Sequence, residues 1–76
     1  MNAGYGIVAN VNYSRGCGFI LPDGDGDRRE VYFEHDAVVG IAFSELHFGD
    51  RVAYAVHPTL TEAGAPRALR VERATG

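Results

Sequence analysis

The residues best suited to binding chemistry in this sequence are two aromatic side chains in short apolar segments. Phe19 follows two glycines in "RGCGFIL", and Tyr32 lies in "EVYFEH". If both segments are strands, alternation puts Phe19 on an outer face and, with Phe33 inward, puts Tyr32 beside it. Two adjacent exposed rings would form a platform on which nucleobases stack. The alternative is that loops cover both rings as a secondary core, and periodicity alone favours neither.

The glycines on either side of Cys17 indicate the shape of this segment. Alternation places Gly16 and Gly18 on the same face as Ile20, away from Cys17. Glycine on an inner face permits the sharp curvature of a small barrel, and Ile20 adds to its core. Cys17 is therefore expected on the outer face, next to Phe19.

The segments that must position these residues are typical of a small all-β protein. Strands are predicted over residues 5–12, 16–21, 30–35, 51–56 and 67–72, with "PDGDGD" as a break after Leu21. Residues 36–40 indicate one helical turn capped by Asp36, and residues 41–50 and 57–65 indicate loops. Five short strands without a long helix indicate a small barrel or sandwich, and five strands in 76 residues favour the barrel. With 76 residues, the chain is expected to form one domain over 1–76, with its core at about 4–73.

Composition limits the classes of function. Cys17 is the single cysteine, so neither an intramolecular disulfide nor a cysteine zinc cluster is expected, and one free thiol suits a reducing cytoplasm. No apolar run approaches the roughly 20 residues that a membrane helix needs. The net charge is -3, with ten acidic residues against seven arginines, which argues against a strongly electrostatic nucleic-acid binder. We expect a cytoplasmic protein.

The order of the motifs resembles the bacterial cold-shock protein family. The segments that carry the resemblance are "GIVANVNYSRGCGFI", "EVYFEHDAV", "GIAFSELHFGDRVAYAV" and "APRALRV". The likeness runs from about residue 4 to residue 73 and keeps the order and spacing of every element. It implies an all-β fold, a closed five-stranded antiparallel β-barrel of the OB-fold type, which binds single-stranded RNA or DNA on an aromatic face. We expect no catalysis and no cofactor.

The resemblance also implies site residues, including positions where this chain departs from the family. Phe19, Tyr32 and Phe43 retain stacking side chains, and Arg15 retains a positive charge for phosphate. The remaining positions carry other residue types: Asn10 for tryptophan, Cys17 for phenylalanine, Glu34 for histidine and His35 for phenylalanine. The tryptophan and one phenylalanine of the family are lost, and each stack is worth about 1–3 kcal/mol. This predicts an affinity roughly 10 to 10⁴-fold below that of a full set of stacking rings. A carboxylate at position 34 is expected to repel phosphate as well.

Two other kinds of site are weaker interpretations. Asp23, Asp25, Asp27 and Glu34 match positions of a calcium-loop template, but Arg28 stands where glycine is needed, so a solvated hairpin loop is favoured and no metal site is predicted. The three histidines (His35, His47 and His57) show no ligand spacing, and Cys17 has no legible orienting partner for nucleophilic catalysis.

A protein-interaction domain is the competing class of function. The apolar residues in "VVGIAF", among them Val38, Val39 and Ile41, lie in or beside a loop, where exposed apolar groups often mark a contact surface. This interpretation predicts a homo-oligomer formed through residues 38–43, with little affinity for nucleic acid.

Overall fold

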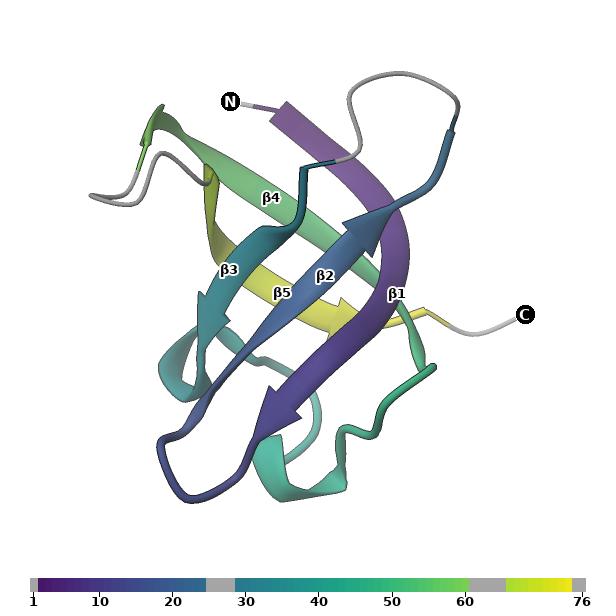
Figure 1. Cartoon of the computed structure of the whole chain (residues 1–76), viewed down its shortest axis with the longest axis vertical. Coiled ribbons are helices and arrows are strands. Elements are labelled where there is room, and N and C mark those ends of the chain that lie inside the picture. Colours follow the sequence, from purple (N-terminus) through teal and green to yellow (C-terminus); the bar gives the residue numbers. More distant parts are fainter. Residues whose placement is uncertain (1, 25–28, 61–65, 75–76) are drawn as a thin grey trace.

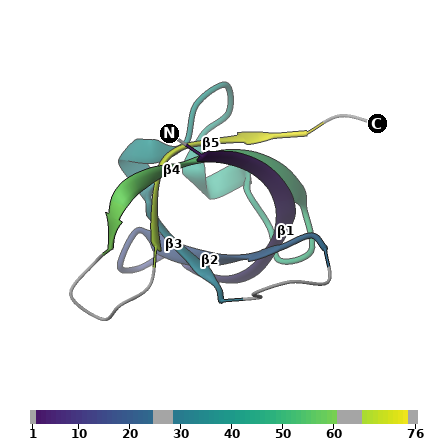
Figure 2. The same ribbon diagram turned by 90° about the horizontal axis from the view of Figure 1, so that it is seen from above.

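Five strands close into a barrel in the part of the chain that the structure describes (Figures 1 and 2). The computed structural model describes residues 2–24, 29–60 and 66–74, and the backbone alone for residues 2 and 57–60. The strands are β1 (Asn2–Asn12), β2 (Cys17–Pro22), β3 (Val31–Glu34), β4 (Arg51–Leu60) and β5 (Pro66–Arg73). Around the barrel they follow the order β1-β2-β3-β5-β4. The sequence-based prediction of a closed five-stranded β-barrel is confirmed.

One strand pair runs parallel, whereas the sequence predicted an antiparallel barrel. β3 and β5 pair in parallel, with Tyr32 opposite Arg67, and the other neighbouring strands pair antiparallel. A closed ring with an odd number of strands cannot alternate direction all the way round. One parallel pair is therefore required, and here it joins two segments far apart in the sequence.

Several element boundaries differ from the prediction. β4 continues through residues 57–60, which were predicted as loop, because Leu60 still pairs with Pro66. Pro22 ends β2 rather than following it, at a strand position that proline tolerates. Residues 61–65, the rest of that predicted loop, lie outside the described residues.

The helical turns are short 3-10 turns. η1 (His35–Ala37) begins one residue before the predicted turn and ends earlier, and η2 (Phe43–Glu45) lies where only loop was predicted. Asp36 is not the cap, because the N-cap position is Glu34, which makes no side-chain capping hydrogen bond. The chain leaves η1 at once in an extended conformation, so a longer helix does not form.

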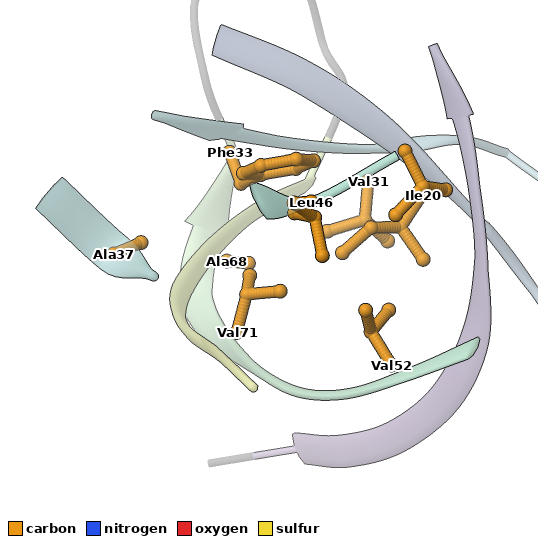
Figure 3. Packing of buried hydrophobic residues seen from close by; sticks show 9 residues of the cluster. Ile20, Val31, Phe33, Ala37, Leu46, Val52, Ala68 and Val71 are labelled. Atoms are coloured by element: carbon orange, nitrogen blue, oxygen red, sulfur yellow. The ribbon is translucent and has the colours of Figure 1, made fainter. Parts of the chain in front are cut away.

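The barrel interior is filled by buried apolar side chains from every strand (Figure 3). The buried residues are Val8, Ile20, Val31, Phe33, Ala37, Leu46, Val52, Ala68 and Val71. In β2 and β3 they alternate with half-exposed residues, as the sequence predicted. The outward side chains of β2 and β3 therefore stand on strands whose inward side chains pack in the core.

Gly18 and Gly16 have different roles. A Cβ at Gly18 would lie 2.5 Å from the Asn10 carbonyl oxygen and 2.8 Å from the Phe33 ring, so only glycine fits between β1 and the core. Gly16 precedes β2 instead of opening it, and its φ of 70° is the left-handed conformation that glycine adopts readily. Its carbonyl accepts a 2.7 Å bond from the amide of His35, which joins the turn to η1.

The apolar residues of the 38–43 segment are not an exposed patch. Val38, Ile41 and Phe43 are half-buried and pack against the core cluster. The Val39 amide also donates a 2.9 Å bond to the Val71 carbonyl. These side chains are therefore half-buried rather than fully exposed, and the homo-oligomer through residues 38–43 stays a prediction.

Candidate nucleic-acid interface

Phe19 and Tyr32 form an aromatic pair on the outer face of β2 and β3. They stand directly opposite each other in the antiparallel ladder, and both are half-buried. Their ring centroids are 5.5 Å apart with an interplanar angle of 63°, an edge-to-face contact. The two rings lie side by side on the outer face, as the sequence predicted.

Glu34 lies next to this aromatic pair and holds two partners. The Tyr32 hydroxyl donates a 3.1 Å hydrogen bond to its Oε2, and Arg67 Nη2 donates a 2.5 Å bond to its Oε1. The carboxylate thus forms an ion pair with Arg67 as well. The sequence indicated a repulsive charge at this position, whereas in the structure the charge faces a guanidinium.

Arg67 is a site residue that sequence reasoning missed. Its guanidinium carbon lies 5.9 Å from the centroid of the Tyr32 ring, within the range of a cation–π contact. The parallel pairing of Tyr32 with Arg67 brings it there from β5. No local pattern indicates this contact, because the two residues meet only through barrel closure.

The phenol of Tyr32 responds to these surroundings. Partial burial raises the pKa of Tyr32 above its ordinary value of 10.0, and the hydrogen bond to Glu34 and its negative charge raise the pKa further. Arg67 opposes the shift by stabilising the phenolate. At neutral pH the phenol is therefore protonated and donates to Glu34.

Cys17 and Asn10 flank the aromatic pair. Cys17 is half-buried and stands opposite Glu34, two pairs along the β2–β3 ladder from Phe19. Asn10 is exposed and stands opposite Phe19 on β1. These two positions, where the resemblance implies aromatic residues, thus lie beside the rings that are present.

A second aromatic group lies beyond Glu34, around Phe43. The Phe43 ring contacts Tyr13 at 5.8 Å, Phe33 at 6.3 Å and His35 at 6.4 Å between centroids. His35 is exposed, whereas Phe43 is half-buried. Phe43 therefore joins the core to the surface, and the predicted residue His35 is placed at its edge.

Tyr13 is the second residue that sequence reasoning missed. It lies in the turn after β1, its side chain is 49% exposed, and its hydroxyl donates a 2.6 Å bond to the Leu46 carbonyl. An aromatic residue in a turn next to Arg15 was the available signal. Its exposed ring extends the aromatic surface beyond Phe43.

Arg15 lies in the same turn and is exposed. The side-chain oxygen of Asn12 accepts bonds from the Arg15 amide at 3.1 Å and from the Ser14 hydroxyl at 2.9 Å. Such an Asx-type arrangement holds the turn through its backbone and leaves the arginine side chain extended toward solvent. Its predicted role at phosphate needs this exposure.

Metal-ligand geometry is missing from the described part of the chain, where no group of three or more His, Cys, Asp or Glu side chains is arranged to hold an ion. Of the calcium-loop template, Asp23 pairs with Arg51 at 2.6 Å and Glu34 with Arg67. Asp25 and Asp27 lie outside the described residues. In the same described ranges, no helix is long and apolar enough to cross a membrane.

A groove of about 330 Å³ lies on another part of the barrel wall, along β1, β4 and β5. It is lined by small and polar residues: Ala3, Gly4, Tyr5, Ala53, Tyr54, Ala55, Arg70 and Glu72. Tyr5 at its edge has Arg51 over its ring at 5.7 Å. None of the residues of the aromatic pair or its partners lines this groove.

The comparison with solved structures agrees with the barrel geometry. No family model and no curated protein matches the sequence. A solved chain of Drosophila Unr, CSD456, matches with a TM-score of 0.68 and 18% identity over 97% of this chain. The fold is that of a cold-shock domain. This chain spans only 27% of the Unr chain, so the likeness concerns one cold-shock barrel.

The structural likeness to the Unr chain does not show membership of the bacterial family. The Unr chain is from Drosophila, and at 18% identity the match describes the fold. The resemblance of the motifs to bacterial cold-shock proteins therefore stays a prediction from the sequence.

Proposed function

We propose that this cold-shock domain binds single-stranded RNA or DNA by stacking bases on the Phe19–Tyr32 pair. The observation that carries the proposal is the position of the two rings, which face outward from paired strands and contact each other at 5.5 Å. Each stack of a base on an aromatic ring is worth about 1–3 kcal/mol and tolerates any base. Binding is therefore expected to show little sequence preference.

The neighbouring residues extend this interface in one direction. Phe43 and His35 would contact a base beyond Glu34, and Arg15 would contact phosphate from the turn. Asn10 and Cys17 offer no ring, so this face of the barrel is expected to stack fewer bases and to bind nucleic acid weakly. The proposal includes no catalysis and no cofactor, and it places the protein in the cytoplasm.

An NMR titration with a short pyrimidine oligonucleotide tests the proposal. Shifts should concentrate at residues 15–19, 32–35 and 43, and they should weaken as salt rises, because phosphate contacts depend on salt. Tyr5 and Ala53, which line the groove on β1 and β4, provide internal controls. Absence of shifts at high protein concentration, or shifts centred on the groove, would contradict the proposal.

A further inference from the structure

Arg67 contacts an aromatic ring in addition to forming an ion pair. Its guanidinium lies over the Tyr32 ring at 5.9 Å and is bonded to Glu34 at 2.5 Å. Tyr32 donates to the other oxygen of the same carboxylate. Glu34 therefore ties an aromatic ring and a planar cation together on the outer face, beside Phe19.

We propose that Glu34 positions Arg67 as a stacking surface for a nucleobase, next to the Phe19–Tyr32 pair. This inference rests on the proposed function and assigns a role to two residues of that site. Bases stack on guanidinium planes as well as on aromatic rings. Arg67 thus supplies a flat surface on a face where Asn10 and Cys17 provide none.

Positioning matters because a free arginine side chain samples many rotamers. Ordering it when a base binds costs conformational entropy, and a partner that holds the guanidinium beforehand reduces this cost. Glu34 is such a partner, since it bonds Arg67 at one oxygen and is itself held by Tyr32 at the other. The side chains of Arg67 and Glu34 are 43% and 39% exposed, so the pair is accessible to a ligand.

The proposal and simple electrostatics give opposite signs for a change at Glu34. If the carboxylate acts mainly by repelling phosphate, Glu34→Gln should tighten binding whatever residue is at position 67. If it positions Arg67, the same change should weaken binding, and only while arginine is present. The ion pair is partly exposed, and such pairs add little to stability, so these variants are expected to fold.

The chain provides a matched control. Arg51 lies over the Tyr5 ring at 5.7 Å and pairs with Asp23 at 2.6 Å, which repeats the tyrosine, arginine and carboxylate arrangement. Tyr5 lines the groove on β1, β4 and β5, away from Phe19. Arg51→Lys therefore changes the same kind of contact without touching the proposed interface.

The experiment measures affinity for a fluorescein-labelled short oligothymidylate by anisotropy. The variants are Arg67→Lys, Glu34→Gln, their double mutant, Arg51→Lys and Phe19→Ala. Arg67→Lys keeps the charge and removes the plane, so it should weaken binding roughly 2- to 25-fold, the range of a cation–π contact. Glu34→Gln should weaken binding at least about 2-fold with Arg67 present and leave it unweakened with lysine, a non-additive cycle.

The outcomes separate this inference from the proposed function. Wild-type affinity in Arg67→Lys, equal losses in Arg67→Lys and Arg51→Lys, or tighter binding in Glu34→Gln would overturn the inference. If Phe19→Ala still lost affinity in those cases, the proposed function would stand. Failure of the wild-type chain to bind would overturn both.

Discussion

Two outer faces of the same barrel carry a tyrosine with an arginine over its ring, yet they differ in what surrounds it. On β2 and β3, Tyr32 contacts a second ring, Phe19, and shares Glu34 with Arg67. On β1, β4 and β5, Tyr5 lines a groove together with alanines, Gly4, Tyr54, Arg70 and Glu72. Side-chain contacts between strands therefore distinguish the face that carries the aromatic pair from the face that carries the groove.

Gly18 and Gly4, one from each face, differ in what an added methyl group would meet. Behind the β2–β3 face, Gly18 is closed in by the Asn10 carbonyl and the Phe33 ring. In the groove, which Gly4 and Tyr54 both line, a Cβ at Gly4 would meet the end of the Tyr54 side chain at 3.1 Å. A backbone carbonyl cannot yield easily, whereas the end of a side chain can. Position 18 is therefore expected to tolerate alanine less well than position 4.

The largest expected effect tests this difference between Gly18 and Gly4. Gly18→Ala should destabilise the fold by at least about 1–3 kcal/mol, because the added methyl group overpacks a site closed by backbone. Gly4→Ala should cost less, under about 1 kcal/mol, because Tyr54 can shift. Urea denaturation of both variants measures the two losses. Equal losses would show that the carbonyl at position 18 and the side chain at position 4 obstruct a methyl group to the same extent.

The next effect concerns Cys17, a position beside Phe19 that carries no aromatic ring. Cys17→Phe should tighten binding of a single-stranded oligonucleotide by about 1–3 kcal/mol, because it adds one ring beside Phe19. Cys17 faces outward and is half-buried, so stability should change by no more than about 0.5 kcal/mol. Cys17→Leu adds apolar bulk without a ring and serves as the control in the same fluorescence assay. A folded Cys17→Phe variant with unchanged affinity would contradict the platform.

The smallest effect is on the titration of Tyr32. Burial raises its pKa above 10.0, and Glu34 raises the pKa further through its hydrogen bond and charge. The pKa of Tyr32 is higher in the folded state than in the unfolded state. The stability that depends on the protonated phenol is therefore complete below the unfolded pKa and is lost as pH rises through the folded pKa. Glu34→Gln should lower the pKa only part of the way, because burial remains.

Ultraviolet titration of tyrosine ionisation measures this shift, with Tyr32→Phe used to identify the signal. An unchanged midpoint for Tyr32 in Glu34→Gln would show that the carboxylate does not act on the phenol.

Much of the platform was predictable because it depends on alternation within a strand. The inward positions of Ile20 and Phe33 and the outward positions of Phe19 and Tyr32 follow from a period of two residues. Arg67 was not predictable, because its contact with Glu34 spans 33 residues and depends on the parallel β3–β5 pair. The ion pair between Arg67 and Glu34 was missed for the same reason.

The end of β4 and the exposure of the 38–43 segment depended on tertiary contacts as well. Residues 57–60 look like loop in the sequence, but pairing with β5 extends the strand. Val38 and Ile41 look like a contact surface, yet they pack against the core. Local patterns indicate which residues are apolar or turn-forming, and barrel closure decides what covers them.

The most direct test of the central claim compares one ring from each outer face. The affinity of a short oligothymidylate should fall roughly 5- to 100-fold in Phe19→Ala, which removes one stack worth about 1–3 kcal/mol. Tyr5→Ala removes a ring that is 56% exposed at the groove and should bind like the wild type. Equal affinities for wild type, Phe19→Ala and Tyr5→Ala, in variants shown to be folded, would contradict stacking on the β2–β3 face.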